Sequence, residues 1–439
     1  MPLTASRGVG RVLPTIAPNI LNTGERSSDQ GALHFAPYVT MKEWPFDMSM
    51  IPYGRQNISE QDIESVVEVL RSDFLTQGPK VPEFEKAVAT YCGAAYAVAA
   101  NSATSALHIA CAALGVGVGD RVWTSPITFV ASANCALYCG ATVDFVDIDA
   151  RTYNMSVGCL SEKLKEASKA GVLPKVVIPV HLAGQSCEMA AIAELSKQYG
   201  FRIIEDASHA IGGTYAGKKI GGCQYSDITV FSFHPVKVVT TGEGGMALTN
   251  DPDLGKRMAR LRSHGITRYP AEMTHAPDGP WYYQQIELGF NYRITDLQAA
   301  LGVSQMRRID EFVERRHIIA RRYDQLLEGS DYIVPWQHPE TYSGQHLYIV
   351  RVPRRLGAAR HQMVFENLRS GGVGVNLHYI PVYRQPYYEA MGFKRDDFPN
   401  SESYYDEAIS LPMFPDLTED QQTEVVRLLK APTGYQTLF

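Results

Sequence analysis

The chain has 439 residues, of which 45% are hydrophobic and 20% are charged, and its formal net charge is −6. This composition is ordinary for a soluble globular protein, and the length suggests about two or three domains. The negative charge argues against nucleic acid as the main partner, although a local positive site can still bind an anion. No apolar run approaches the roughly 18 residues of a membrane-spanning helix, so we expect no membrane association.

The N-terminal segment differs from the rest of the chain. Residues 1–47 are rich in Gly, Ser, Thr and Pro with weak hydrophobic periodicity, which predicts a disordered extension. Two arginines precede its first acidic residue, a pattern that faintly resembles a transit peptide, but no apolar core or cleavage signal supports secretion. An alternative is a true start at Met48 or Met50, because folded-protein patterning begins at Ile51.

The cysteines indicate the compartment. The chain has seven of them and no Cys-x-x-Cys pair. Cys135 and Cys139 have a possible metal-ligand spacing, but no paired histidine lies nearby. We therefore expect small core thiols, no metal site and a cytoplasmic protein.

Folded elements begin with two helices. Ser59 caps an amphipathic helix over residues 58–71, with Asp62 at its third position. A turn then leads into a second helix over about 82–91.

Strands and helices alternate from residue 96 to about residue 250. Strands are expected at 96–100, 121–124, 142–146, 175–180, 202–205, 228–232 and 246–249, and helices at 103–114, 128–139, 160–170 and 188–199. This alternation predicts an α/β fold with a mostly parallel seven-stranded sheet and helices on both faces. Ligands of such sheets bind at the carboxyl ends of the strands.

A smaller C-terminal α+β domain is expected after the sheet. Helices are predicted at 295–306, 309–328, 358–369 and 418–430, and strands at 345–352 and 373–378. We expect a large domain over residues 51–305 and a small domain over residues 306–432.

One lysine stands out chemically. Residues 226–246 read SDITVFSFHPVKVVTTGEGGM and place Lys237 just past an expected strand. Semi-apolar surroundings can lower the pKa of a lysine enough to make it a nucleophile. Asp206 ends an upstream strand, and such a pair suits pyridoxal phosphate (PLP): the lysine forms a Schiff base, and the carboxylate keeps the pyridine nitrogen protonated. The alternative is that Lys237 is one surface lysine among 41 basic residues.

A PLP site also needs a phosphate cradle and a group that presses on the ring. Ala103 and Thr104 open a helix after a strand, where backbone N–H groups bind phosphate. Ser232 could add a hydroxyl, Phe129 is the candidate for ring stacking, and His209 could hydrogen-bond the cofactor or its carboxylate partner. The alternatives are an ordinary helix cap, a core aromatic and a structural histidine.

Five motifs carry a resemblance to a known family. They are FLTQGPKVPEFEKA (74–87), NSATSALH (101–108), EDASHAIGG (205–213), FSFHPVKVVTTGEGG (231–245) and GFNYRITDLQAALG (289–302). Together they resemble the DegT-type sugar nucleotide aminotransferases, a family of fold-type I PLP enzymes, over about residues 51–432.

The resemblance implies a role for each site residue. Lys237 is implied as the Schiff-base lysine and Asp206 as the pyridinium partner, with Phe129 stacked on the ring. The phosphate is implied to contact Ala103, Thr104 and Ser232. Asn291 is implied to reach the phosphate of the neighbouring subunit, with Arg293 beside it to help bind carboxylate or phosphate. Because such sites are built across a dimer interface, the resemblance also implies a homodimer with shared active sites.

Three further motifs indicate a subfamily. TSPITFVASANCALYCGA (124–141), RSHGI (262–266) and VNLHYIPVYRQPYY (375–388) are similar to the transaminases of pseudaminic acid biosynthesis. These enzymes transfer an amino group from L-glutamate to a 4-keto-6-deoxy UDP-N-acetyl sugar, giving UDP-4-amino-4,6-dideoxy-N-acetyl-β-L-altrosamine, a precursor of cell-surface polysaccharide or flagellin glycan. The resemblance places these residues around the sugar nucleotide: Tyr53, Asp73, Phe74, Leu75, Thr76, Arg293, His378, Tyr379 and Tyr383. Residues 268–287 look like an insertion whose only assignable role is to cover the active site or interface.

Three alternatives remain at this point. The first is an aminotransferase of the same family for another 4-keto sugar nucleotide. The second is a PLP-dependent sugar dehydratase, but the dehydratases that resemble this family have histidine where this chain has Lys237. The third is a non-catalytic regulator, since fold alone does not determine function. Retention of the lysine, aspartate, serine and asparagine argues against it.

Overall fold

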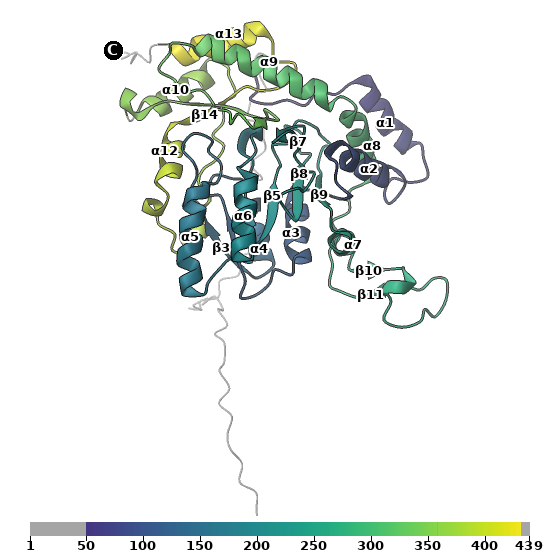
Figure 1. Ribbon diagram of the computed structural model, residues 1–439. Helices are drawn as coiled ribbons and strands as arrows, with labels where there is room; N and C mark the ends of the chain where they lie inside the picture. The colour runs from purple at the N-terminus through teal and green to yellow at the C-terminus, as the bar shows by residue number, and fades with distance from the viewer. Residues whose placement is uncertain (1–49, 358, 432–439) are drawn as a thin grey trace, which may run out of the picture. The chain divides into compact units, whose positions relative to one another are not determined.

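A computed structural model describes residues 50–357 and 359–431. The predicted N-terminal extension, residues 1–47, lies outside the described residues. A seven-stranded sheet organises residues 96–249 (Figure 1), in the order β1-β9-β8-β5-β4-β2-β3. Its strands are β1 (Tyr96–Ala100), β2 (Arg121–Thr124), β3 (Thr142–Phe145), β4 (Val176–Ile178), β5 (Arg202–Asp206), β8 (Ile228–Ser232) and β9 (Gly245–Thr249). Strands β3, β2, β4, β5 and β8 pair in parallel, and β9 runs antiparallel between β8 and β1. This confirms the mostly parallel sheet.

Helices cover both faces of the sheet because successive strand residues point to opposite sides. Val122 packs with α3 (Ala103–Ala113), α4 (Ala131–Tyr138) and α7 (Pro252–Leu261), whereas Trp123 packs with α5 (Val157–Ala170) and α6 (Met189–Tyr199). On the Trp123 face, α2 (Lys80–Cys92) and α8 (Asp296–Met306) cover the β8–β9–β1 half, and α1 (Glu60–Leu70) packs on α8.

A second layer holds the C-terminal part of the chain. It contains α9 (Ile309–Leu327), β13 (Tyr348–Arg351), α10 (Arg360–Ser370), α12 (Pro399–Glu407), β14 (Ala408–Leu411) and α13 (Glu419–Lys430). Strands β13 and β14 pair antiparallel, and Ile51 joins the same core. The prediction of a strand at 373–378 is wrong. Val373 bridges Ile51 whereas Asn376 bridges Ser410, so neither ladder extends beyond one pair.

Short elements complete the described chain. They are β6 (Thr214–Tyr215), β7 (Lys218–Lys219), β10 (Ile266–Thr267), β11 (Gln284–Gln285), β12 (Thr341–Tyr342), α11 (Pro386–Glu389) and the 3-10 helices η1 (Leu182–Gly184), η2 (Pro270–Glu272), η3 (Arg354–Leu356), η4 (Val382–Arg384) and η5 (Arg395–Asp397). The segment between β10 and β11 projects as an arm beyond α7 (Figure 1), with Tyr269 and Trp281 exposed.

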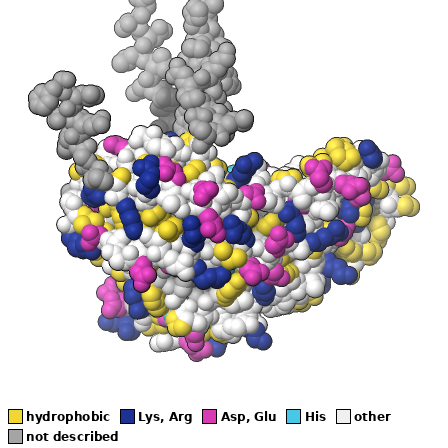
Figure 2. Space-filling view, turned by 90° about the horizontal axis from the view of Figure 1, so that it is seen from above, with side chains coloured by type: hydrophobic (Ala, Val, Ile, Leu, Met, Phe, Trp, Pro, Cys, Tyr) yellow, Lys and Arg dark blue, Asp and Glu magenta, His cyan; other side chains and the backbone are white. Residues whose placement is uncertain are grey.

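The surface carries charges of both signs. Seen from the α9 and α13 side, Lys and Arg side chains are interspersed with Asp and Glu, and no extended area of that face has a single sign (Figure 2). Among the described residues, no helix combines the length and the apolar character needed to cross a membrane.

Candidate active site

A cavity of about 670 Å³ lies at the carboxyl ends of β5 and β8, where Asp206 and Ser232 are the last strand residues. Its walls come from both layers of the molecule. The predicted site residues that line it are Tyr53, Ala103, Thr104, Phe129, Asp206, His209, Ser232, Lys237, His378 and Tyr379. Residues that are far apart in sequence therefore meet at the carboxyl ends of the strands, where ligands of such sheets bind.

Lys237 is positioned by a turn after β8, in which its backbone N–H donates to the carbonyl of His234 at 2.9 Å. Burial lowers the pKa of the Lys237 ammonium to about 8, while the nearby Asp206 carboxylate works in the opposite direction. The amine form of the side chain is therefore far more accessible near neutral pH than that of an ordinary lysine. A group of this kind can act as a nucleophile and as an acid or base.

Asp206 is held by hydrogen bonds on both carboxylate oxygens. The backbone N–H of Ser208 donates to Oδ1 at 3.1 Å, and Ser132 Oγ donates to Oδ2 at 2.5 Å. The Ser132 hydroxyl is also 2.7 Å from Thr128 Oγ1. Asp206 is 5% exposed, and these hydrogen bonds orient its carboxylate. Ser132 and Thr128 were not predicted from the sequence; their spacing of four residues beside Phe129 was the only available signal.

The N-terminus of α3 forms one wall of the cavity. Ser102 caps this helix by accepting from the backbone N–H of Ser105 at 3.1 Å. The first N–H groups of a helix have no partner inside the helix, so Ala103 and Thr104 can offer theirs to a phosphate. Gly245 of β9 lies directly behind them: a Cβ atom there would be 2.4 Å from the Ala103 nitrogen. Glycine is therefore required for the close approach of β9 to this cradle.

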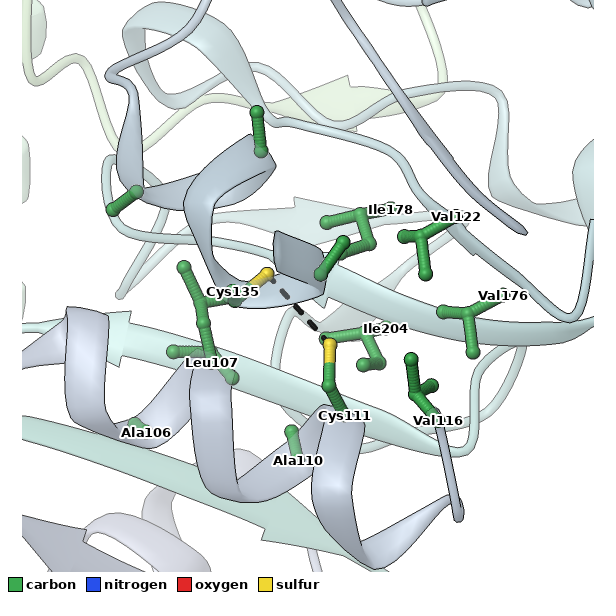
Figure 3. Packing of buried hydrophobic residues seen from close by; sticks show 14 of the residues in the cluster. Ala106, Leu107, Ala110, Cys111, Val116, Val122, Cys135, Val176, Ile178 and Ile204 are labelled. Atoms are coloured by element: carbon green, nitrogen blue, oxygen red, sulfur yellow. Dashed lines mark hydrogen bonds between the residues drawn. The ribbon is translucent and has the colours of Figure 1, made fainter. Parts of the chain in front are cut away.

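Helices α3 and α4 are fixed beneath the cavity by a tightly packed core (Figure 3). Cys111 of α3 and Cys135 of α4 lie with their sulfurs 3.6 Å apart, against Ile178 and Ile204 of the sheet. Both cysteines are fully buried and unbridged. They are small core residues at the contact between α3, which begins with Ala103 and Thr104, and α4, which carries Ser132.

Phe129 provides a flat surface on the cavity wall. Its side chain lines the cavity yet remains 59% exposed, with the ring of Tyr379 6.3 Å away. An exposed aromatic face beside a cavity suits stacking on a planar ring. An amine, a buried carboxylate, a helix N-terminus and this ring together fit PLP.

Three buried histidines surround Lys237. His209 Nδ1 accepts from the backbone N–H of Ala183 at 3.2 Å, so Nε2 carries the proton and donates to Tyr379 Oη at 3.0 Å. Burial and the neighbouring Lys237 hold the pKa of His209 well below its usual value, and they lower the pKa of His378 to about 3. The third is His346, whose Nε2 is 3.5 Å from Lys237 Nζ. No sequence motif had singled out His346.

Other predicted residues lie away from this cavity. The segment 73–76 is largely exposed after α1, and Thr76 bridges Thr295. Arg293 donates to Ser263 Oγ at 3.2 Å and lines a second cavity of about 350 Å³. Asn291 bridges Ser263 on the same side. Within one chain these residues do not join Lys237.

Tyr383, which was also predicted to lie around the sugar nucleotide, is buried in the core. Its side chain is 1% exposed, its ring stacks on Phe398 at 4.5 Å, and its hydroxyl donates to Glu402 Oε1 at 2.7 Å. The polar end of the side chain is thus already paired inside the core, and Tyr383 does not line the cavity.

Known proteins match almost all of the described chain. Residues 56–430 match the DegT/DnrJ/EryC1/StrS aminotransferase family. The spore coat polysaccharide biosynthesis protein SpsC of Bacillus subtilis is 38% identical over 87% of this chain and 96% of its own. The UDP-4-amino-4,6-dideoxy-N-acetyl-β-L-altrosamine transaminase of Campylobacter jejuni is 37% identical over 83% of this chain and 92% of its own.

Solved structures agree with this match. PseC of Helicobacter pylori, an aminotransferase of pseudaminic acid biosynthesis, superimposes with a TM-score of 0.79 at 29% identity, covering 87% of this chain and 98% of PseC. The PLP form of Spr1654 from Streptococcus pneumoniae gives 0.78 at 30% identity, with the same two coverages. The predicted family, fold, enzyme class and cofactor are therefore confirmed. This chain belongs to the DegT/DnrJ/EryC1/StrS family and is a fold-type I, PLP-dependent sugar aminotransferase.

Proposed function

We propose that this enzyme transfers the amino group of L-glutamate to C4 of UDP-2-acetamido-2,6-dideoxy-β-L-arabino-hex-4-ulose. The product is UDP-4-amino-4,6-dideoxy-N-acetyl-β-L-altrosamine, and the pathway is pseudaminic acid biosynthesis. The observation that carries amino transfer is Lys237, a lysine with a lowered pKa in the same cavity as the buried Asp206 carboxylate. The choice of sugar is supported by the 37% identity to the Campylobacter jejuni altrosamine transaminase.

The cofactor half of the cavity is assigned by chemistry. Ala103, Thr104 and Ser232 would hold the phosphate, Phe129 would stack on the ring, and His209 would lie beside it. Asp206 would hold a proton at the pyridine nitrogen, which makes bound PLP an electron sink for carbon–hydrogen bond cleavage.

Lys237 would carry out the proton transfers of the reaction. In the first half of the cycle, its Nζ would take a proton from the α-carbon of L-glutamate and pass it to the bound cofactor. Water would then release 2-oxoglutarate, and the amino group would stay on the cofactor. In the second half, Nζ would carry a proton from the cofactor to C4 of the sugar, which receives the amino group. Because the first product leaves before the sugar reacts, ping-pong kinetics are expected.

The substrate half draws on more distant segments. Tyr53, His378 and Tyr379 line the cavity opposite the sheet edge, where a sugar nucleotide would enter. We place the diphosphate side of the site at the border with a second copy of the chain, in a homodimer. Asn291 of that copy would reach the PLP phosphate, with Arg293 and residues 73–76 close by. We propose a cytoplasmic enzyme, in keeping with its free cysteines.

A second candidate is amino transfer to a different 4-keto sugar nucleotide. The GDP-perosamine synthase of Caulobacter vibrioides is 35% identical over 87% of this chain and 98% of its own. Relatives of different sugar specificity thus have similar identity to this chain.

The deciding experiment offers both 4-keto-6-deoxy epimers. The full chain with PLP and L-glutamate is incubated with the L-arabino and the D-xylo UDP-sugar, and the product mass and C4 configuration are determined. We expect the L-arabino sugar to be aminated. Turnover of the D-xylo sugar alone would reject the altrosamine assignment and leave the aminotransferase assignment intact. A GDP-linked 4-keto sugar serves as the third substrate and tests the alternative.

A further inference from the structure

Arg316 is a buried cation without a carboxylate partner among the described residues. It belongs to α9 and is 1% exposed. Its Nη1 donates to the backbone carbonyls of Gln345, His346 and Met413 at 3.3, 3.2 and 3.0 Å, and its Nε has no partner within the described part of the chain. Buried charges are normally paired with opposite charges. A guanidinium held only by carbonyl groups therefore leaves its positive charge uncompensated.

That charge lies directly behind His346. The backbone oxygen of His346 accepts from Arg316, while the ring faces Lys237 with Nε2 3.5 Å from Nζ. The side chain lines the active-site cavity, and Nδ1 is buried without a hydrogen-bond partner among the described residues. The ring of His209 packs against it at 4.5 Å.

The groups that face His346 are cations or other imidazoles. Burial first, and then Lys237, His209, Arg316 and His378, hold the pKa of His346 well below its usual value. Asp206 acts on the ammonium of Lys237 instead. The imidazole of His346 is therefore uncharged, and in the tautomer that carries its proton on Nδ1, its Nε2 can accept a hydrogen bond.

We propose that His346 is a positioning residue for the proton-carrying form of Lys237, and that Arg316 helps burial to keep the imidazole uncharged. This rests on the role proposed above for Lys237 in proton transfer. When Nζ takes up a proton, the ammonium donates to Nε2 and is held in place. The neutral ring offers an acceptor without adding negative charge, whereas a protonated ring would repel the ammonium.

The first test measures Lys237 alone. In the cofactor-free full chain, Lys237 is labelled with cyanate across a pH series, and carbamylation is quantified by peptide mass spectrometry. In the wild-type protein, the midpoint of Lys237 carbamylation is expected at a pH of about 8. In His346→Phe, a ring remains but the acceptor is lost, so the midpoint falls by about 0.5–1 pH unit, the size of one hydrogen bond. His346→Gln restores an acceptor and should return the midpoint towards the wild-type value.

A matched control separates positioning from packing. His317 neighbours Arg316 on α9, but its ring stacks on Tyr342 and its Nε2 bonds the carbonyl of Ser343. His317→Phe should leave the Lys237 midpoint unchanged. If His346→Phe keeps the wild-type midpoint, His346 only fills space and the proposal is wrong.

The second test measures the charge of His346. With carbon-13-labelled histidine, the His346 resonance is identified by its absence in His346→Gln and followed against pH. It should stay uncharged well below 6.5 in the wild type and in Arg316→Lys, and titrate at higher pH in Arg316→Met. Titration near 6.5 in the wild-type protein would overturn the proposal. Neither test uses a sugar, so a wrong substrate assignment leaves both results unchanged.

Discussion

The two halves of the active-site cavity are built in different ways. The cofactor half consists of residues at strand ends and at the start of α3, all supported by one sheet. The proposed substrate half consists of Tyr53 and the segment around His378, which are supported by the C-terminal layer and by no continuous ladder. Under the proposed assignment, the amino-transfer chemistry lies on the rigid sheet, and sugar specificity lies on segments that can vary without disturbing the sheet.

The largest effect is expected from replacing Lys237, the lysine of the cofactor half. Lys237→Ala should lower kcat by at least about 10³-fold, because both the nucleophile and the proton carrier are removed. Turnover is measured with glutamate and the keto sugar. Lys218→Ala, at an exposed lysine, is the matched control and should retain wild-type turnover. Substantial turnover in Lys237→Ala would show that the cofactor half is wrongly assigned.

Asp206→Asn should lower kcat by about 10²–10³-fold, because the amide cannot hold the pyridine proton. The same change also has a pH signature. The Asp206 carboxylate raises the pKa of Lys237 against the effect of burial, so its loss should move the Lys237 labelling midpoint below about 8. Ser132→Ala removes one donor to Asp206 and should have a smaller effect in the same assays. A normal kcat in Asp206→Asn would remove this carboxylate from the chemistry.

Sequence patterns predicted which residues meet at the sheet edge of the cavity, because strand ends follow a simple rule. Strand ends of a parallel sheet meet along one edge, so Asp206, Ser232 and Lys237 could be expected together. His346 and Arg316 could not, since they reach the site only through the packing of α9 and the segment before β13. The expected strand at 373–378 had a plausible apolar pattern, but its two bridge partners lie in different segments.

The substrate half is tested by Tyr53→Phe. Tyr53 lines the cavity with its ring 5.6 Å from that of His378, and burial raises the pKa of its hydroxyl. Loss of the hydroxyl should raise KM for the sugar nucleotide about 5–10-fold, the value of one hydrogen bond, and leave the half-reaction with glutamate nearly unchanged. If Tyr53→Phe slows the glutamate and the sugar half-reactions equally, Tyr53 does not belong to a separate substrate half of the cavity.

The smallest effect is expected from replacing Tyr383. This test distinguishes a tyrosine that contacts the substrate from one that only packs in the core. Tyr383→Phe removes the hydrogen bond to Glu402, but Arg384 Nε still donates to the same carboxylate at 2.8 Å, so no buried charge is left unpaired. The free energy of unfolding should therefore fall by only about 1 kcal/mol, measured by urea denaturation, while KM for the sugar stays at the wild-type value. A raised KM with unchanged stability would return Tyr383 to the sugar site. It would also mean that the segment after His378 turns inward when substrate binds, because the hydroxyl would have to leave Glu402 to reach the cavity.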